Sequence, residues 1–249
     1  MLSLSSSSRF SAAAIVCALA APAFADAPIL ALTVNAGAAS KLQDLNANSI
    51  AGGTGIYNGT VVGADSIWSL YYNLNASTSV TTDGAAQTGA SSWVNGSVAI
   101  TNMTSSEVAY MISLTVPTDV VDAMWGRFNG TTSGTLVTNG AGYINTIAAA
   151  SLWTGTTAGT TVATLFDAPI NVTRSSSGAT SLGSRSFGLP VGVEVAEFGA
   201  AMSLIFRFNL SAGDTASFTT GLNGVGFAIP APGAIALLAL AGFVARRRR

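Results

Sequence analysis

Apolar and polar residues alternate with a period of two in several short segments of this chain. In residues 108–116 every second residue is apolar, from Val108 to Val116, and Pro117 follows directly. Residues 97–102 repeat the alternation, with Val98 and Ile100 on one face. This period is typical of strands that bury one face. The pattern predicts a strand pair over 97–102 and 108–116, and further strands over 29–35, 67–73, 162–166, 191–195, 202–209 and 216–220.

Turn signals separate these segments. Asn-Gly, a strong signal for a tight hairpin turn, occurs five times, beginning at Asn58, Asn95, Asn129, Asn139 and Asn223. A further turn is predicted over 211–214, and a last strand over 221–228. Short strands between repeated turns indicate an all-β fold, a single antiparallel β-sandwich of the jelly-roll or immunoglobulin-like kind over residues 26–228.

Two segments depart from the strand pattern. Residues 119–127 place Val120 with Met124 and Val121 with Trp125, and this i, i+4 spacing predicts a short helix. Residues 131–156 carry little apolar periodicity and are predicted to form a long loop.

Composition excludes several functions. Residues 26–229 hold eleven acidic and five basic residues, a net charge of −6 that repels phosphate backbones, so we expect no nucleic-acid partner. The chain has no histidine, and its one cysteine, Cys17, precedes this region. Ser-His-Asp triads, cysteine nucleophiles and His- or Cys-ligated zinc are therefore excluded. No phosphate-binding glycine loop of the G-x-x-x-x-G-K-S/T type occurs, and no cofactor is predicted.

Carboxylates leave two alternatives open. Asp119 with Asp122, or Glu194 with Glu197, could form the acid pair of a glycosidase. Residues 44–48, Asp-Leu-Asn-Ala-Asn, begin like a calcium loop, but its sixth and twelfth positions are Ser49 and Gly55. We favour solvated acids and a turn-rich connection over a catalytic pair or a metal site, and we expect no enzyme activity.

Aromatic residues suggest another possible function, the binding of polysaccharide by a carbohydrate-binding module. Trp68, Tyr71 and Tyr72 form the densest cluster, with Trp68 and Tyr72 on one strand face and Tyr71 on the other. Most aromatics of such a protein belong to its core. A sugar platform would need exposed rings, and Trp68 is the first residue that this hypothesis would test.

The first 25 residues have the features of a secretory signal peptide. Arg9 supplies the positive charge, residues 10–21 are mostly apolar, and Ala23-Phe24-Ala25 is a cleavage site of the A-x-A type. Cleavage by signal peptidase after Ala25 would leave a mature chain that begins at Asp26. The protein is therefore expected to be exported.

The C-terminal segment, residues 229–249, also predicts handling at a membrane. Pro230-Ala231-Pro232-Gly233 precedes an apolar run over 234–245, and the chain ends in Arg246, Arg247, Arg248 and Arg249. A helix of twelve residues rises about 18 Å, less than a hydrocarbon core of about 30 Å, so it suits a temporary anchor. The arginines should remain in the cytoplasm, which leaves the preceding residues outside. An ordinary membrane anchor is the alternative.

This order of proline motif, apolar helix and arginine cluster resembles the sorting signals of bacterial PEP-CTERM proteins. It is closest to the Pro-Ala-Pro-Gly-Ala variant, and Ala231 stands where the family's motif has Glu. The resemblance implies processing by an exosortase-type enzyme after transient membrane insertion. It also implies a β-rich protein of the cell envelope, cell surface or extracellular matrix, and the missing catalytic residues favour a non-enzymatic one.

Overall fold

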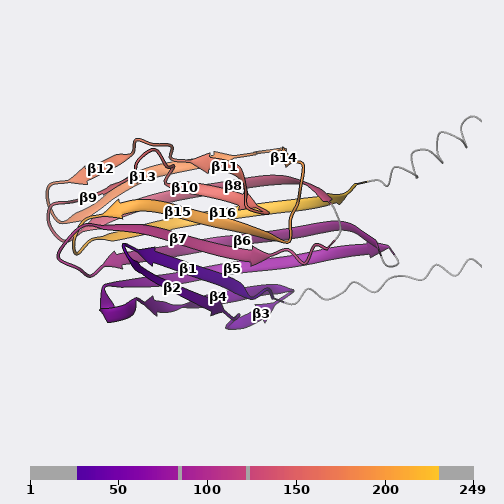
Figure 1. The fold of residues 1–249 in the computed structure, drawn as a ribbon, viewed down its shortest axis with the longest axis horizontal. Helices are drawn as coiled ribbons and strands as arrows, with labels where there is room; N and C mark the ends of the chain where they lie inside the picture. The colour runs from indigo at the N-terminus through magenta and orange to yellow at the C-terminus, as the bar shows by residue number, and fades with distance from the viewer. Residues whose placement is uncertain (1–26, 84–85, 122–123, 230–249) are drawn as a thin grey trace, which may run out of the picture.

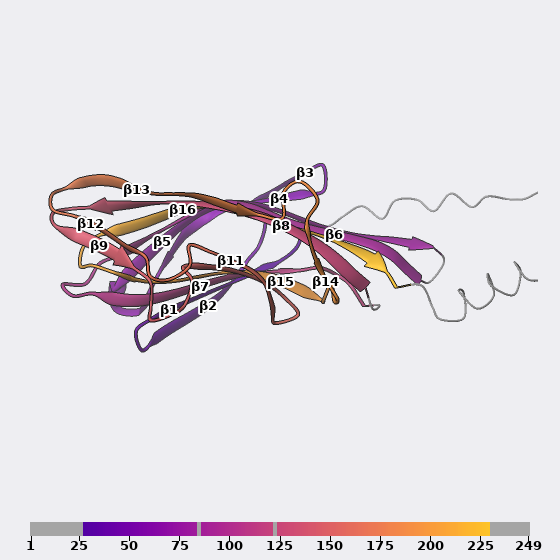
Figure 2. The ribbon, with the colours of Figure 1, turned by 90° about the horizontal axis from the view of Figure 1, so that it is seen from above.

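The computed structural model describes residues 27–83, 86–121 and 124–229, which form two antiparallel β-sheets packed face to face (Figures 1 and 2). Apart from one 3₁₀ turn, η1 (Ala64–Ser66), the regular elements in these ranges are strands. The prediction of an all-β fold with two antiparallel layers is confirmed. The predicted helix over the C-terminal segment and the predicted signal peptide lie outside the described residues.

The first sheet has the strand order β11-β10-β15-β7-β1-β2, with β9 pairing with β15 and β12 with β9. Buried and partly exposed residues alternate strictly along β1 and β15. The strands are β1 (Leu30–Ala36), β2 (Ala39–Leu45), β7 (Val108–Pro117), β9 (Gly142–Asn145), β10 (Trp153–Thr157), β11 (Thr160–Leu165), β12 (Asn171–Arg174) and β15 (Ala201–Leu210).

The second sheet has the order β13-β8-β16-β6-β5-β4-β3, with β14 also pairing with β8. Its central strands are the longest of the described chain, and β16 lies between β6 and β8 along almost its whole length. The strands are β3 (Ser49–Ala51), β4 (Thr54–Val62), β5 (Trp68–Asp83), β6 (Ala86–Asn102), β8 (Met124–Thr138), β13 (Gly178–Phe187), β14 (Val193–Val195) and β16 (Thr215–Ala228).

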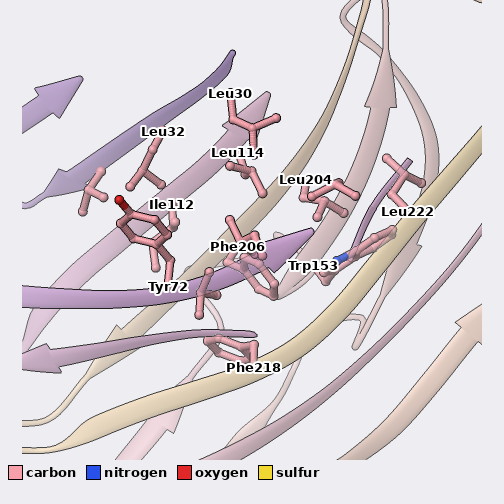
Figure 3. Packing of buried hydrophobic residues seen from close by; sticks show 14 of the residues in the cluster. Leu30, Leu32, Tyr72, Ile112, Leu114, Trp153, Leu204, Phe206, Phe218 and Leu222 are labelled. Atoms are coloured by element: carbon pink, nitrogen blue, oxygen red, sulfur yellow. The ribbon is translucent and has the colours of Figure 1, made fainter. Parts of the chain in front are cut away.

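Aromatic rings from both sheets fill the space between the layers (Figure 3). Phe206 of β15 stacks on Phe218 of β16 with ring centroids 4.6 Å apart. Trp153 of β10 is fully buried, and its indole N–H donates a hydrogen bond to Thr220 Oγ1 of β16 at 3.0 Å. Each large ring removes much apolar surface from water, so these contacts dominate the attraction between the sheets.

The connections at one end of the sandwich are fastened by a buried polar network. Asn102 is fully buried, and its side-chain N–H groups donate to the carbonyl oxygens of Ser106, Leu210 and Ser211 at 2.8–3.0 Å. Asp214 accepts hydrogen bonds from the Ser211 hydroxyl and the Asn139 backbone N–H. The predicted turn over 211–214 is confirmed. Since buried polar groups are costly without partners, this network fixes the passage from β15 to β16.

Every predicted strand overlaps an observed one, and two other predictions are wrong. Residues 119–127 form no helix within the described range, because Met124 and Trp125 begin β8 and residues 118–121 have no regular structure. Residues 131–156 are not one long loop, since β8 continues to Thr138 and β9 and β10 follow. Small residues fill these strands, and pairing with neighbouring strands outweighs their weak apolar pattern.

Four of the five predicted Asn-Gly turns are also wrong, because the pairs lie inside β4, β6, β8 and β16; the pair at Asn139 alone lies between strands. In each of the four strands the asparagine points outward and the glycine inward. A Cβ on Gly130 would come within 2.5 Å of the Phe187 ring, and one on Gly224 equally close to Phe128. Gly59, Gly130 and Gly224 therefore leave room for inward rings, whereas Gly96, at φ 141°, leaves room for the backbone of β5; none of the four forms a turn.

Candidate functional site

The residues of the two predicted processing signals are not described by the structure. Ala23 and Ala25, the motif residues Pro230 to Gly233, and the four terminal arginines all lie outside the described ranges. Among the residues that the structure does describe, no helix is long and apolar enough to cross a membrane. The sorting signal therefore remains a prediction from the sequence.

The carboxylates of the sequence analysis are spread over the surface. Glu194 accepts two hydrogen bonds from Arg127, with an N–O distance of 2.6 Å in the shorter, while Glu197 is exposed on the following loop. Asp119 is exposed and Asp122 lies outside the described residues. In the segment that begins like a calcium loop, Asn48 Oδ1 accepts the backbone N–H of Asn58. Within the described ranges, no three acidic residues gather as a metal site would require.

The aromatic residues divide between the two faces of the second sheet. Trp68 and Tyr72 point into the core and are 1% and 8% exposed, so Trp68 is wrong as a sugar platform. Tyr71, on the opposite face of β5, is 49% exposed. Trp93 of β6 and Trp125 of β8 also face outward and are partly exposed. The accessible rings therefore lie on the outer face of the second sheet, which is the face turned away from the first sheet.

Uncharged polar residues cover this outer face. Among β5, β6, β8 and β16, only Asp83 at the end of β5 and Arg127 of β8 carry charge. The outward asparagine side chains make no hydrogen bond to any other residue in the described parts of the chain, and their amides offer both donors and acceptors. These asparagines are Asn73 and Asn75 of β5, Asn95 of β6, Asn129 of β8 and Asn223 of β16.

A hollow of about 300 Å³ lies in the middle of the outer face, over β6, β16 and β8. Strand pairing places its outward residues in two rows. Trp93, Asn223 and Asn129 form one row, and Asn95, Gly221 and Thr131 form the other. Because neighbouring strands are about 4.8 Å apart, the walls on β6 and β8 stand about 10 Å from each other. We call this feature the Gly221 hollow.

Gly221 creates the hollow because it is the one position of the two rows without a side chain. An added Cβ there would meet its nearest neighbour, Asn95 Cβ, at 3.5 Å, which is an ordinary contact. The floor of the hollow is therefore open, whereas a Cβ on the inward glycines of β8 and β16 would meet core side chains. A partly exposed indole, three amides and one hydroxyl surround this space, and none of the six residues is charged.

The Arg127–Glu194 ion pair lies beside the hollow on the same face. Arg127 precedes Asn129 by one outward position on β8, and its guanidinium lies 5.4 Å from the centre of the Trp125 ring. Glu194 neutralises its charge, and the pair is solvent-exposed, so it adds little electrostatic attraction for a charged ligand. The hollow is suited to neutral molecules that carry both hydroxyl groups and apolar C–H faces.

Sequence reasoning missed Trp93 as a site residue because Asn95-Gly96 was interpreted as a turn. That interpretation makes the strand begin at Ser97, although the parity of Val98 and Ile100 continues backwards through Val94. On that parity Trp93 is out of phase with the core residues and must point outward. The signal was present in the sequence but required the strand to be extended through the glycine.

Comparisons with known proteins give little guidance. No protein-family model and no curated protein sequence matches this chain. Among solved structures, TmCBM61, a carbohydrate-binding module in complex with β-1,4-galactotriose, is similar to it. The two chains are 8% identical, the match covers 61% of this chain and 86% of that one, and the TM-score is 0.24. A TM-score this low carries no argument about this chain's fold or function.

Proposed function

We propose that this protein is an exported, non-enzymatic binder of neutral polysaccharide, and that the Gly221 hollow is its binding site. The observation that carries the proposal is the hollow itself, an open space lined by uncharged residues with an indole at one corner and amides around it. A sugar ring presents hydroxyl groups at its rim and C–H bonds on its faces. Those two surfaces match the amides and the indole respectively.

The Trp93 indole supplies the apolar half of this recognition. The face of an aromatic ring is electronegative and attracts the slightly positive C–H bonds of a sugar. Asn95, Asn129 and Asn223 supply the polar half, since each amide has two N–H donors and one oxygen acceptor. A rigid sheet holds these groups in place, so little conformational freedom is lost when a ligand binds.

The terminal signals suggest where this binding would occur. Export by the signal peptide, transient insertion of the C-terminal segment and processing by an exosortase-type enzyme would leave the protein at the cell surface or in the extracellular matrix. The last described strand, β16, ends at Ala228, one residue before that segment. Intact-mass analysis of the protein from its host tests this route, with a chain from Asp26 to about Pro232 expected and a chain ending in Arg249 contradicting it.

Affinity electrophoresis of the full-length protein through gels that contain neutral polysaccharides tests the binding. The panel would include mixed-linkage β-glucan, galactomannan, arabinoxylan and β-1,4-galactan. Any detergent in the gels would carry no sugar head group. We expect at least one polymer to retard the protein. Trp93→Ala and Gly221→Leu should each weaken binding about tenfold or more, or about 1.4 kcal/mol, because one removes the platform and the other fills the hollow.

Val137→Ala is the matched control, because Val137 is a 42% exposed apolar residue on the outer face of β8, at the end remote from the hollow. Its retardation should equal that of the unchanged protein. Unfolding midpoints in urea would confirm that all three variants are folded. The proposal fails if no polysaccharide of the panel retards the protein, or if Gly221→Leu binds as well as Val137→Ala.

A further inference from the structure

Three aromatic positions stand on the outer face of the second sheet, and the Gly221 hollow holds only the middle one. Tyr71 of β5 is 49% exposed. Trp93 of β6 borders the hollow. Trp125 of β8 and Phe227 of β16 stack on each other with ring centroids 4.4 Å apart and planes inclined by 22°, and they form one paired platform.

Strand register places these three positions on a diagonal. Tyr71 pairs with Ala99, which is six residues along β6 from Trp93. Trp93 in turn pairs with Asn223, four residues along β16 from Phe227, and Phe227 pairs with Trp125. At about 3.4 Å per residue, the separations along the strands are about 20 Å and 14 Å. Across the sheet, Tyr71 lies on β5, Trp93 on the neighbouring strand β6, and the platform on the next two strands, β16 and β8.

The surface between the aromatic positions is mostly polar and carries no unpaired charge. Asn73, Asn75 and Asn95 lie between Tyr71 and Trp93. Asn223, Ser91 and the one apolar residue Val225 lie between Trp93 and the Trp125–Phe227 platform. Arg127 borders this path beside Trp125, but Glu194 already pairs with it, so an acidic or basic polymer would lose hydration there and gain no unpaired charge. The path suits a neutral chain over its whole length.

We propose that a long, unbranched neutral polysaccharide lies along this diagonal and contacts Tyr71, Trp93 and the Trp125–Phe227 platform together. The inference rests on the proposed function, since Trp93 is the central contact. The three positions span far more than a trisaccharide can cover. Contacts joined within one ligand reinforce each other, because after the first contact the others form at high effective concentration. Affinity should therefore depend on the length of the chain.

Isothermal titration with short and long oligosaccharides tests the track. The probes are β-1,4-linked gluco-, manno-, xylo- and galacto-oligosaccharides, each as the trimer and as a mixture centred on about ten units, added to the full-length protein. In any series that binds, we expect the long probe to bind about tenfold or more tightly than the trimer, as joined contacts require.

Variants of the outer positions separate the track from the hollow. Tyr71→Ala and Trp125→Ala should each weaken binding of the long probe about fivefold and leave the trimer unchanged within about twofold, because the trimer reaches only the central contact. Trp93→Ala should weaken binding of both probes. Val137→Ala, on the same face but off the diagonal, is again the control.

The outcomes distinguish the two proposals. Equal affinities for trimer and long probe, or loss of trimer binding in Tyr71→Ala, would overturn the track while the Gly221 hollow remains a binding site. Both proposals are supported if Trp93→Ala loses binding of the trimer and of the long probe, and if affinity depends on chain length in the unchanged protein. If no series binds, the proposed function fails and the track fails with it.

Discussion

The two faces of the second sheet use glycine in opposite ways. On the inner face, glycines of β8 and β16 make room for rings: a Cβ on Gly126 or Gly224 would come within 2.7 Å of Phe198. On the outer face of the same strand β16, Gly221 leaves a space that no side chain fills. The difference indicates that the inner glycines serve packing, whereas the outer one leaves open the space that we propose as a binding site.

The largest expected effect is the loss of a ring from the inner face. Phe198 is 1% exposed, stacks on Phe128 with centroids 5.2 Å apart, and covers three inward glycines. Phe198→Ala should lower the free energy of unfolding by about 3–5 kcal/mol, since it leaves a cavity that glycines cannot fill. Trp93→Ala, on the outer face, should change it by less than about 1 kcal/mol. Urea unfolding measures both, and equal losses would remove the distinction between the faces.

The next effect compares two glycines of β16 directly. Gly224→Ala would place a Cβ 2.5 Å from the Phe128 ring and should lower the free energy of unfolding by about 1–3 kcal/mol, because the ring must shift. Gly221→Ala meets only ordinary contacts and should leave stability unchanged within about 0.5 kcal/mol. The measurement is again urea unfolding. Equal destabilisation by the two substitutions would contradict the assignment of the hollow as unfilled space.

A smaller effect comes from a tyrosine on the inner side of β4. Burial raises the pKa of Tyr57 from 10.0 to about 12, and its hydroxyl donates to the Pro28 carbonyl oxygen. The unfolded chain therefore ionises first, and stability that is present below pH 10 falls as the pH rises towards 12. Between pH 8 and 11 the loss should be about 1.4 kcal/mol from this residue.

Tyr57→Phe is the matched variant for this pH effect. Between pH 8 and 11 the free energy of unfolding of this variant should fall by about 1.4 kcal/mol less than that of the unchanged protein, because phenylalanine has no proton to release. Burial also raises the pKa of Tyr110, which contributes in the same direction in both proteins. An identical pH dependence for the two proteins would exclude Tyr57 as a source of the effect.

The smallest effect concerns salt. None of the residues around the Gly221 hollow is charged, and the neighbouring Arg127 is paired with Glu194. Affinity for a neutral polysaccharide should therefore change by less than about twofold between roughly 50 mM and 500 mM sodium chloride, because a neutral ligand forms no ion pair with the protein that salt could screen. Affinity electrophoresis in the two salts measures this. A fall of about tenfold would point to an ionic contact instead.

The sequence predicts the layers of this fold better than its surface. Alternation in β7 and β15 identifies their buried faces, because a strand between core and solvent must alternate. Asn-Gly predicts turns wrongly here, because in Asn129-Gly130 and Asn223-Gly224 the asparagine lies on the outer face and the glycine leaves room for a core ring. The Gly221 hollow could not be predicted, because it depends on which residues of β6 and β8 flank Gly221. Strand order, which local pattern does not determine, decides that.

The most direct test is a titration of the full-length protein, with ¹⁵N-labelled tryptophan, against the neutral polysaccharides of the panel, followed through the indole N–H resonances. Trp93 lies at the hollow and Trp125 on the proposed track, whereas Trp68 and Trp153 are at most 1% exposed. The account predicts that the Trp93 resonance shifts most, and that those of Trp68 and Trp153 stay in place. Binding that leaves the Trp93 resonance unmoved, or no shift with any polymer, would contradict it.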